Sequence, residues 1–246
     1  MAGGAQAGGT QHEKHRQRMY RRVEKTGFEG FSEHEVLEYI LYFAVPRRDT
    51  NPIAHALTER FGGFAQVLEA GEQELLEVPG IGPTSARLLH SLLGIGRYYA
   101  HCKTSNIRFL RTDTEKEAYF SALFYGQSSE SFWLIALDDR LRILRRAKIS
   151  EGVSNAVGTS VSRIAAEAVS ASATGVVLAH NHPTGFAAPS AGDIAATAQI
   201  MQALRPLNIF VLDHYIVTPD GVCSMKQRGN LPRYNPATGE VCYIHE

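Results

Sequence analysis

Two histidines one residue apart, at the end of an apolar run, constrain this chain more than any other stretch. The run Gly175–Ala179 is apolar and partly β-branched, a composition that favours a buried strand. His180 and His182 follow it, and side chains two positions apart on a strand point to the same side. The sequence therefore predicts a strand that presents two imidazoles together at its end, which is half of a metal site.

A third ligand is predicted a few residues further along the chain. Pro183 and Gly185 force a turn, and Ser190 then opens a helix whose Asp193 can bring a carboxylate back toward the histidines. Two histidines and a carboxylate, with a fourth position left to water, form the ligand set of a hydrolytic zinc site. The alternative is that Ser190 and Asp193 form only a helix cap with its partner three residues on.

These residues spell His-x-His, then Pro, then Ser-x-x-Asp, a pattern that resembles the JAMM (MPN-plus) metalloprotease motif. The longer form His-Asn-His-Pro-Thr-Gly, with Asp213 and His214 downstream, resembles the bacterial RadC family, and the resemblance extends over nearly the whole chain after the N-terminal tail. It implies a JAMM/MPN-like domain of the cytidine-deaminase-like kind, Zn²⁺ as the cofactor, and a peptide or isopeptide substrate. His180, His182 and Asp193 are the metal ligands that it implies.

The resemblance also implies a general acid/base close to the metal, because JAMM proteins carry a glutamate where the first core strand begins. Glu130 stands at that place, immediately before the apolar run Phe132–Leu137. Glu151, at the end of the next strand, is the competing candidate. Ser190 is the motif serine, placed to donate to the oxyanion or to hold the metal-bound water. The pair Asp213-His214 either supports the ligands or is structural.

Composition sets broad limits on the class of protein. The chain has 246 residues, of which 44% are hydrophobic, which is enough for two small domains or one large one. The 25 lysines and arginines equal the 25 aspartates and glutamates, so no global field attracts nucleic acid or an anionic membrane. Three cysteines without a Cys-x-x-Cys pair favour a reducing, cytoplasmic location and oppose a thiolate zinc site. No stretch is long and apolar enough to cross a bilayer, so we expect no membrane association.

The N-terminal part is expected to be a flexible tail, 1–10, followed by an all-helical domain, 11–102. The segment Gln11–Lys25 is basic and predicts a helix that either contacts phosphates or is simply solvated. The turn Val78–Pro83, between two predicted helices, looks like a helix-hairpin-helix, in which Gly80 and Gly82 would contact a DNA phosphate. The alternative is an ordinary tight turn. Residues 1–102 carry 11 lysines and arginines against 12 aspartates and glutamates, which is not the footprint of a strong DNA binder.

The C-terminal part predicts an α/β sandwich with a mixed sheet, because strands and helices alternate along it. We place the junction at 103–114, the metal-binding domain at 115–226, and an irregular tail at 227–246. The predicted elements are a helix at Glu115–Tyr125, strands at Ser131–Leu137 and Leu141–Ser150, a helix at Ser162–Ser170, the histidine strand at Val176–Ala179, a helix at Ile194–Leu204 and a strand at Ile209–Val217.

The function that these patterns favour is a RadC-like zinc metallohydrolase that cleaves an amide or isopeptide bond. The alternative is a DNA-binding factor of DNA repair or recombination that uses the helix-hairpin-helix, with the metal domain as an accessory. A third reading, an inactive scaffold, is disfavoured because every type of ligand is present.

Overall fold

The computed structural model describes residues 11–152, 157–183, 185–235 and 237–242. The chain divides into two compact units, one ending at Gly96 and the other beginning at Arg97. This division lies inside a long helix, N-terminal to the junction expected at 103–114. Each unit has a buried hydrophobic core of its own.

The N-terminal unit is helical, as its sequence predicts. Its first helices begin and end at residues with known capping roles. The Glu35 carboxylate accepts a hydrogen bond from the Ser32 backbone N–H at 2.9 Å, and Gly62 ends the third helix with a positive φ of 94°. None of the described helices combines the length and apolar character that crossing a bilayer requires. The helices are α1 (Gln11–Thr26), α2 (Glu33–Leu41), α3 (Asn51–Phe61), α4 (Phe64–Glu69), α5 (Glu72–Leu76) and α6 (Pro83–Ser105), which continues into the second unit.

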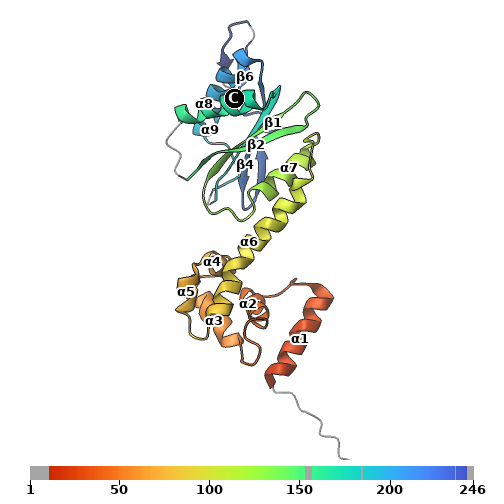
Figure 1. The fold of residues 1–246 in the computed structure, drawn as a ribbon, viewed down its shortest axis with the longest axis vertical. Coiled ribbons are helices and arrows are strands. Elements are labelled where there is room, and N and C mark those ends of the chain that lie inside the picture. Colours follow the sequence, from red (N-terminus) through yellow and green to blue (C-terminus); the bar gives the residue numbers. More distant parts are fainter. Residues whose placement is uncertain (1–10, 153–156, 184, 236, 243–246) are drawn as a thin grey trace, which may run out of the picture. The chain divides into compact units, whose positions relative to one another are not determined.

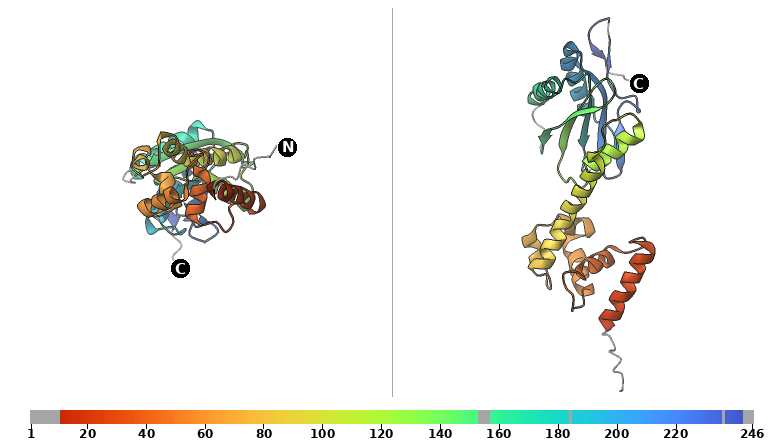
Figure 2. Two further views of the ribbon diagram at one scale, coloured as in Figure 1. Left: turned by 90° about the horizontal axis from the view of Figure 1, so that it is seen from below. Right: turned by 45° about the vertical axis from the view of Figure 1, so that its right-hand side comes forward.

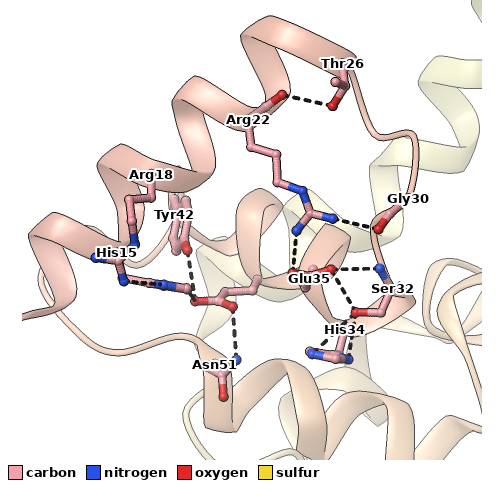
Figure 3. Close-up of polar contacts among 11 residues, drawn as sticks. His15, Arg18, Arg22, Thr26, Gly30, Ser32, His34, Glu35, Tyr42 and Asn51 are labelled. Atoms are coloured by element: carbon pink, nitrogen blue, oxygen red, sulfur yellow. Dashed lines mark hydrogen bonds and ion pairs between the residues drawn. The ribbon is translucent and has the colours of Figure 1, made fainter.

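The basic helix α1 is attached to the rest of its unit by polar contacts (Figure 3). Arg22 donates to Glu35 at 2.7 Å, and His15 Nε2 lies 3.1 Å from the buried carboxylate of Glu38. Arg16 donates to three backbone carbonyls in the segment after α2. Part of the basic character predicted for this segment therefore serves internal packing, while the cations exposed along α1 are Lys14, Arg18, Arg21 and Lys25.

The C-terminal unit contains a five-stranded mixed sheet, which confirms the predicted fold class. The strand order is β2-β1-β3-β4-β5. Strand β1 is antiparallel to β2 and to β3, β3 and β4 are parallel, and β5 is antiparallel to β4. The strands are β1 (Ser131–Leu137), β2 (Ile143–Glu151), β3 (Gly175–Asn181), β4 (Phe210–Thr218) and β5 (Gly221–Ser224).

Helices cover both faces of this sheet (Figures 1 and 2). Helices α8 (Val157–Ser170) and α9 (Ala191–Leu204) lie on one face, and α7 (Asp113–Leu123) lies on the other. The alternation of β3 explains why it is apolar from Gly175 to Ala179: Leu178 packs in the core under α8 and α9, whereas Ala179 packs in the core under α7. His180 has the same parity as Leu178, so its side chain belongs to the α8/α9 face.

The segment 227–246, predicted to be irregular, contains a short two-stranded ribbon in its described part, and this corrects the prediction. Strands β6 (Arg233–Tyr234) and β7 (Val241–Cys242) pair antiparallel, joined by a turn in which Gly239 has a φ of 73°. The Arg205 guanidinium, on the short 3₁₀ helix η1 (Arg205–Leu207), lies 4.5 Å from the Tyr234 ring. This cation–π contact ties the ribbon to the sheet domain, and two-residue strands give no readable alternation in a sequence.

Candidate metal centre

Strand β3 delivers two histidines to one end of the sheet, as predicted. His180 is 8% exposed, and the backbone N–H of His182 donates to the Val217 carbonyl at 2.8 Å, which extends the pairing with β4. Asn181 points to the opposite face, where its Oδ1 accepts from the Ser131 N–H at 2.8 Å. The backbone that carries the two imidazoles is therefore held by β4 on one side and by β1 on the other.

The chain then turns and brings Asp193 back to the histidines. Gly185 packs closely against His182, since a Cβ at this glycine would lie 3.1 Å from the His182 Cβ. Ser190 is the N-cap of α9, and Asp193 Oδ2 accepts from its N–H and its Oγ, both at 2.7 Å. Asp193 Oδ1 lies 3.1 Å from His180 Nε2. The cap and the ligand readings of Asp193 are therefore compatible, because each uses a different carboxylate oxygen.

The three predicted ligands form one cluster. His180 Nε2 and His182 Nε2 are 2.8 Å apart, and His182 Nε2 lies 3.8 Å from Asp193 Oδ2. Their candidate ligand atoms all lie within 4.8 Å of one another, and no other group of this kind occurs in the part of the chain that the structure describes. Burial raises the pKa of the Asp193 carboxyl, but its contacts with the His180 imidazole and with the hydroxyl and backbone N–H of Ser190 hold this pKa well below its usual range. Asp193 is thus a carboxylate, ready to bind a cation.

His214, which the sequence analysis left undecided, lies directly behind His180. His214 Nε2 is 2.8 Å from His180 Nδ1, and its other nitrogen is 2.7 Å from Thr197 Oγ1. Complete burial holds the pKa of His214 well below its usual value. Asp213 faces away and accepts from Ser224 Oγ at 2.6 Å. His214 alone of the pair therefore contacts the ligands, a role that only the β3–β4 register could have revealed.

A cavity of about 400 Å³ opens beside the cluster. The cluster residues, Ser190 and Glu130 all line it. Glu130 lies two residues before Phe132, which pairs with His180 in the antiparallel β1–β3 register, so it belongs to the end of the sheet that carries the histidines. The alternative base, Glu151, has its carboxylate 3.1 Å from Lys148 Nζ. The apolar side chains lining the cavity are Phe132, Val161, Ile164, Ala196 and Ile200.

Comparison with known families decides what this domain is. Residues 110–230 match the model of the RadC family, described as the RadC-like JAB domain. The C-terminal unit contains a RadC-like JAB domain. The matched residues include all three candidate metal ligands as well as Glu130, Ser190 and His214, so the site lies within the JAB domain and not at its border.

The glycine turn predicted to contact DNA lies before the matched JAB domain, between α5 and α6. Gly80 has a φ of 94°, and a Cβ there would lie 2.9 Å from two side-chain carbons of Ile53, so this position requires glycine for packing. The Gly82 N–H donates to Ser85 Oγ at 2.9 Å and is engaged within the turn. These contacts explain both glycines structurally, and phosphate binding by the turn stays a prediction.

Proposed function

We propose that the JAB domain is a zinc-dependent hydrolase that cleaves an amide or isopeptide bond. The observation that carries this proposal is the cluster of His180, His182 and Asp193 at the wall of a cavity that Glu130 also lines. Two imidazoles and one carboxylate are a recurrent ligand set of catalytic zinc, which leaves a coordination position for solvent or substrate.

The residues present fit zinc. Ligand atoms about 2.0–2.1 Å from a tetrahedral ion lie roughly 3.3–3.5 Å from one another. The separations here are 2.8 Å between the two Nε2 atoms and 3.1 and 3.8 Å from these to the carboxylate oxygens. Two imidazole nitrogens at 2.8 Å repel unless a cation or a proton lies between them. A zinc ion bound there would supply Lewis acidity toward water and the scissile carbonyl.

The protein's own groups then move protons and exclude water. In the proposed reaction the Glu130 carboxylate accepts a proton from the attacking water and delivers it to the amide nitrogen as the C–N bond breaks. Ser190 holds Asp193, and donation from its hydroxyl to the carbonyl oxygen would require that hydroxyl to rotate away from Asp193. The apolar walls formed by Phe132 and Ile164 lower the local dielectric around these charges.

The test is hydrolysis by the zinc-loaded full chain. A peptide library and a set of peptides linked through a lysine ε-amide are incubated in ¹⁸O-water, and products are identified by mass spectrometry. Glu130→Gln is expected to retain zinc but to lower the rate on the order of 10²–10⁴-fold, since the general base is lost. His182→Ala and Asp193→Ala are expected to lose both zinc and activity.

Glu151→Gln is the matched control, because it removes the competing carboxylate from the neighbouring strand. We expect its rate to stay within about twofold of the wild type, since Glu151 is paired with Lys148. Equal rates for the wild type and Glu130→Gln, or cleavage that persists in Asp193→Ala, would refute the proposed function.

A further inference from the structure

We propose that His214 and Thr197 are positioning residues, which fix the tautomer of His180 and connect it to the helix that carries Asp193. This inference deepens the proposed function and rests on it for the identity of the ligands. It assigns no contact with substrate to either residue.

The contacts form an unbroken chain through three elements. His180 on β3 meets His214 on β4 with 2.8 Å between Nδ1 and Nε2, and His214 Nδ1 lies 2.7 Å from Thr197 Oγ1 on α9. Thr197 Oγ1 lies 2.6 Å from the backbone carbonyl of Asp193, one helical turn earlier. His214 and Thr197 are both 0% exposed, so these polar atoms have no access to bulk water.

The direction of each hydrogen bond between Asp193, Thr197, His214 and His180 follows from which of their atoms carry a proton. The Asp193 carbonyl has none, so the single hydroxyl proton of Thr197 must point to it at this 2.6 Å separation. Thr197 Oγ1 then accepts from His214, which places the ring proton of His214 on Nδ1. Among the described residues, the hydrogen-bond partners of this fully buried ring are His180 and Thr197 and no carboxylate, so we take the ring as neutral, with a lone pair on Nε2.

The tautomer of His214 determines the tautomer of His180, the candidate metal ligand. Because His214 Nε2 is an acceptor, the proton between the two rings belongs to His180 Nδ1. A neutral His180 then has its lone pair on Nε2, the atom that faces His182 and Asp193. If the hydrogen bonds ran in the opposite direction, a neutral His180 would carry its proton on Nε2, and that atom could not serve as a ligand. The order found here therefore prepares His180 for a cation.

The neighbouring ring of Phe132 supports this role by limiting how the imidazoles can turn. Phe132 stacks with His180 at a centroid separation of 6.1 Å and meets His214 edge to face at 5.4 Å. The other contact of the Thr197 hydroxyl is Met225 Sδ at 3.8 Å, a weak acceptor that does not compete with a carbonyl. Phe132 thus packs against both histidines of the hydrogen-bond chain.

Two substitutions of His214 separate positioning from simple packing. In His214→Gln the side-chain amide oxygen can take the place of Nε2 and accept from His180, whereas in His214→Asn the amide can reach only Thr197. Zinc affinity of the full chain is measured by competition with a chromophoric chelator. We expect His214→Asn to bind zinc about 10–100-fold more weakly and His214→Gln to stay within about threefold of the wild type. Equal affinities for the two variants would overturn the proposal, whether both are lowered or both are unchanged.

A second pair of variants tests the direction of these hydrogen bonds. Thr197→Val keeps the shape but removes the hydroxyl, and Thr197→Ser restores it. We expect Thr197→Val to weaken zinc binding and Thr197→Ser to recover it, at thermal midpoints that show both variants to be folded. If Thr197→Ser fails to recover the affinity while Thr197→Val is folded, the hydroxyl does not direct the chain.

A measurement without metal keeps this inference separate from the proposed function. Nitrogen-15 NMR of the metal-free full chain is expected to show His214 protonated at Nδ1 and unprotonated at Nε2, and Thr197→Val is expected to perturb these signals. Protonation of His214 at Nε2 would contradict the chain of donors even if the wild type hydrolyses amides. Conversely, a protein with this tautomer that binds no zinc would refute the proposed function but not the hydrogen-bond order.

Discussion

Both units of this protein place an imidazole beside a carboxylate, yet the two clusters differ in their balance of donors and acceptors. In the N-terminal unit, the Glu38 carboxylate is 1% exposed and is surrounded by donors. It accepts from the Tyr42 hydroxyl at 2.9 Å and from the Asn51 amide at 3.0 Å, and it lies 3.1 Å from His15 Nε2. Such a cluster is complete without an ion.

In the JAB domain the corresponding atoms are acceptors that face one another. The Nε2 atoms of His180 and His182 converge at 2.8 Å beside one Asp193 oxygen, and the hydrogen bonds from Ser190 go to the other oxygen. The comparison teaches that proximity of histidine and carboxylate does not by itself identify a metal site. What distinguishes the second cluster is an excess of lone pairs that only a cation or additional protons can relieve.

The largest expected loss of stability comes from removing the carboxylate at the centre of the N-terminal cluster. Glu38→Ala leaves the Tyr42 hydroxyl and the Asn51 amide without their acceptor, and we expect the N-terminal unit to lose about 3 kcal/mol of stability. Hydrogen exchange of α1–α3, followed by mass spectrometry, measures this loss. Zinc affinity should not change; a fall in zinc affinity for this variant would break the distinction between the two clusters.

Zinc should stabilise only the JAB domain. At a free zinc concentration of about 100 times Kd, binding is expected to add about 2.7 kcal/mol to the stability of the domain, because the ligands converge only in the folded state. Urea unfolding followed by the fluorescence of Trp133, the single tryptophan, reports on this domain. Asp193→Ala should lose the zinc-dependent shift. An equal shift in that variant would mean that zinc binds elsewhere.

The two capping serines offer a matched pair with smaller effects. Ser190→Ala and Ser32→Ala each remove an N-cap hydroxyl. Ser190→Ala should cost about 1 kcal/mol, because Ser190 Oγ accepts from the Asp193 N–H, whereas Ser32→Ala should cost less, because the Ser32 hydroxyl only donates to Glu35. Only Ser190→Ala should also weaken zinc binding, because Ser190 orients Asp193. Chelator competition and urea unfolding of both variants test this. Unchanged zinc affinity in Ser190→Ala would restrict Ser190 to the cap.

The smallest effect is a pH dependence in the N-terminal unit. The hydrogen bond from the Ser32 N–H lowers the pKa of Glu35, against an opposing effect of burial and with help from Arg22. Because the folded-state pKa of Glu35 lies below the unfolded value of about 4.3, Glu35 stabilises the unit at pH values above about 4.3. This stabilisation is lost as the pH falls through the lower, folded-state pKa. The stability difference between wild type and Glu35→Gln should be under about 1 kcal/mol at pH 7 and should disappear in acid, once the pH is below the folded-state pKa of Glu35, with or without zinc. A difference that persists in acid would contradict this assignment.

Much of the fold could be predicted because local signals agree with the final structure. The apolar run before His180 and the serine at position 190 each mark an element that forms as expected, a buried strand and the start of α9. The histidine spacing predicted the side on which both imidazoles lie. In these places the local preference and the tertiary packing favour the same conformation.

Other features depend on contacts that no local pattern encodes. The role of His214 follows from the register in which Leu178 pairs with it, and that of Thr197 from the way α9 packs on the sheet. The ribbon β6–β7 is held by Arg205 from a distant segment. Whether Asp193 is a cap or a ligand could not be decided from its spacing, because the structure lets it be both.

The most direct test of the account is the zinc content of the purified full chain after dialysis against a weak chelator. We expect one zinc per chain in the wild type and in the control variant His15→Ala, whose imidazole belongs to the N-terminal cluster. His182→Ala and Asp193→Ala should retain essentially none. If these two variants hold as much zinc as the wild type, or if His15→Ala loses its zinc, then the cluster of His180, His182 and Asp193 is not the zinc site.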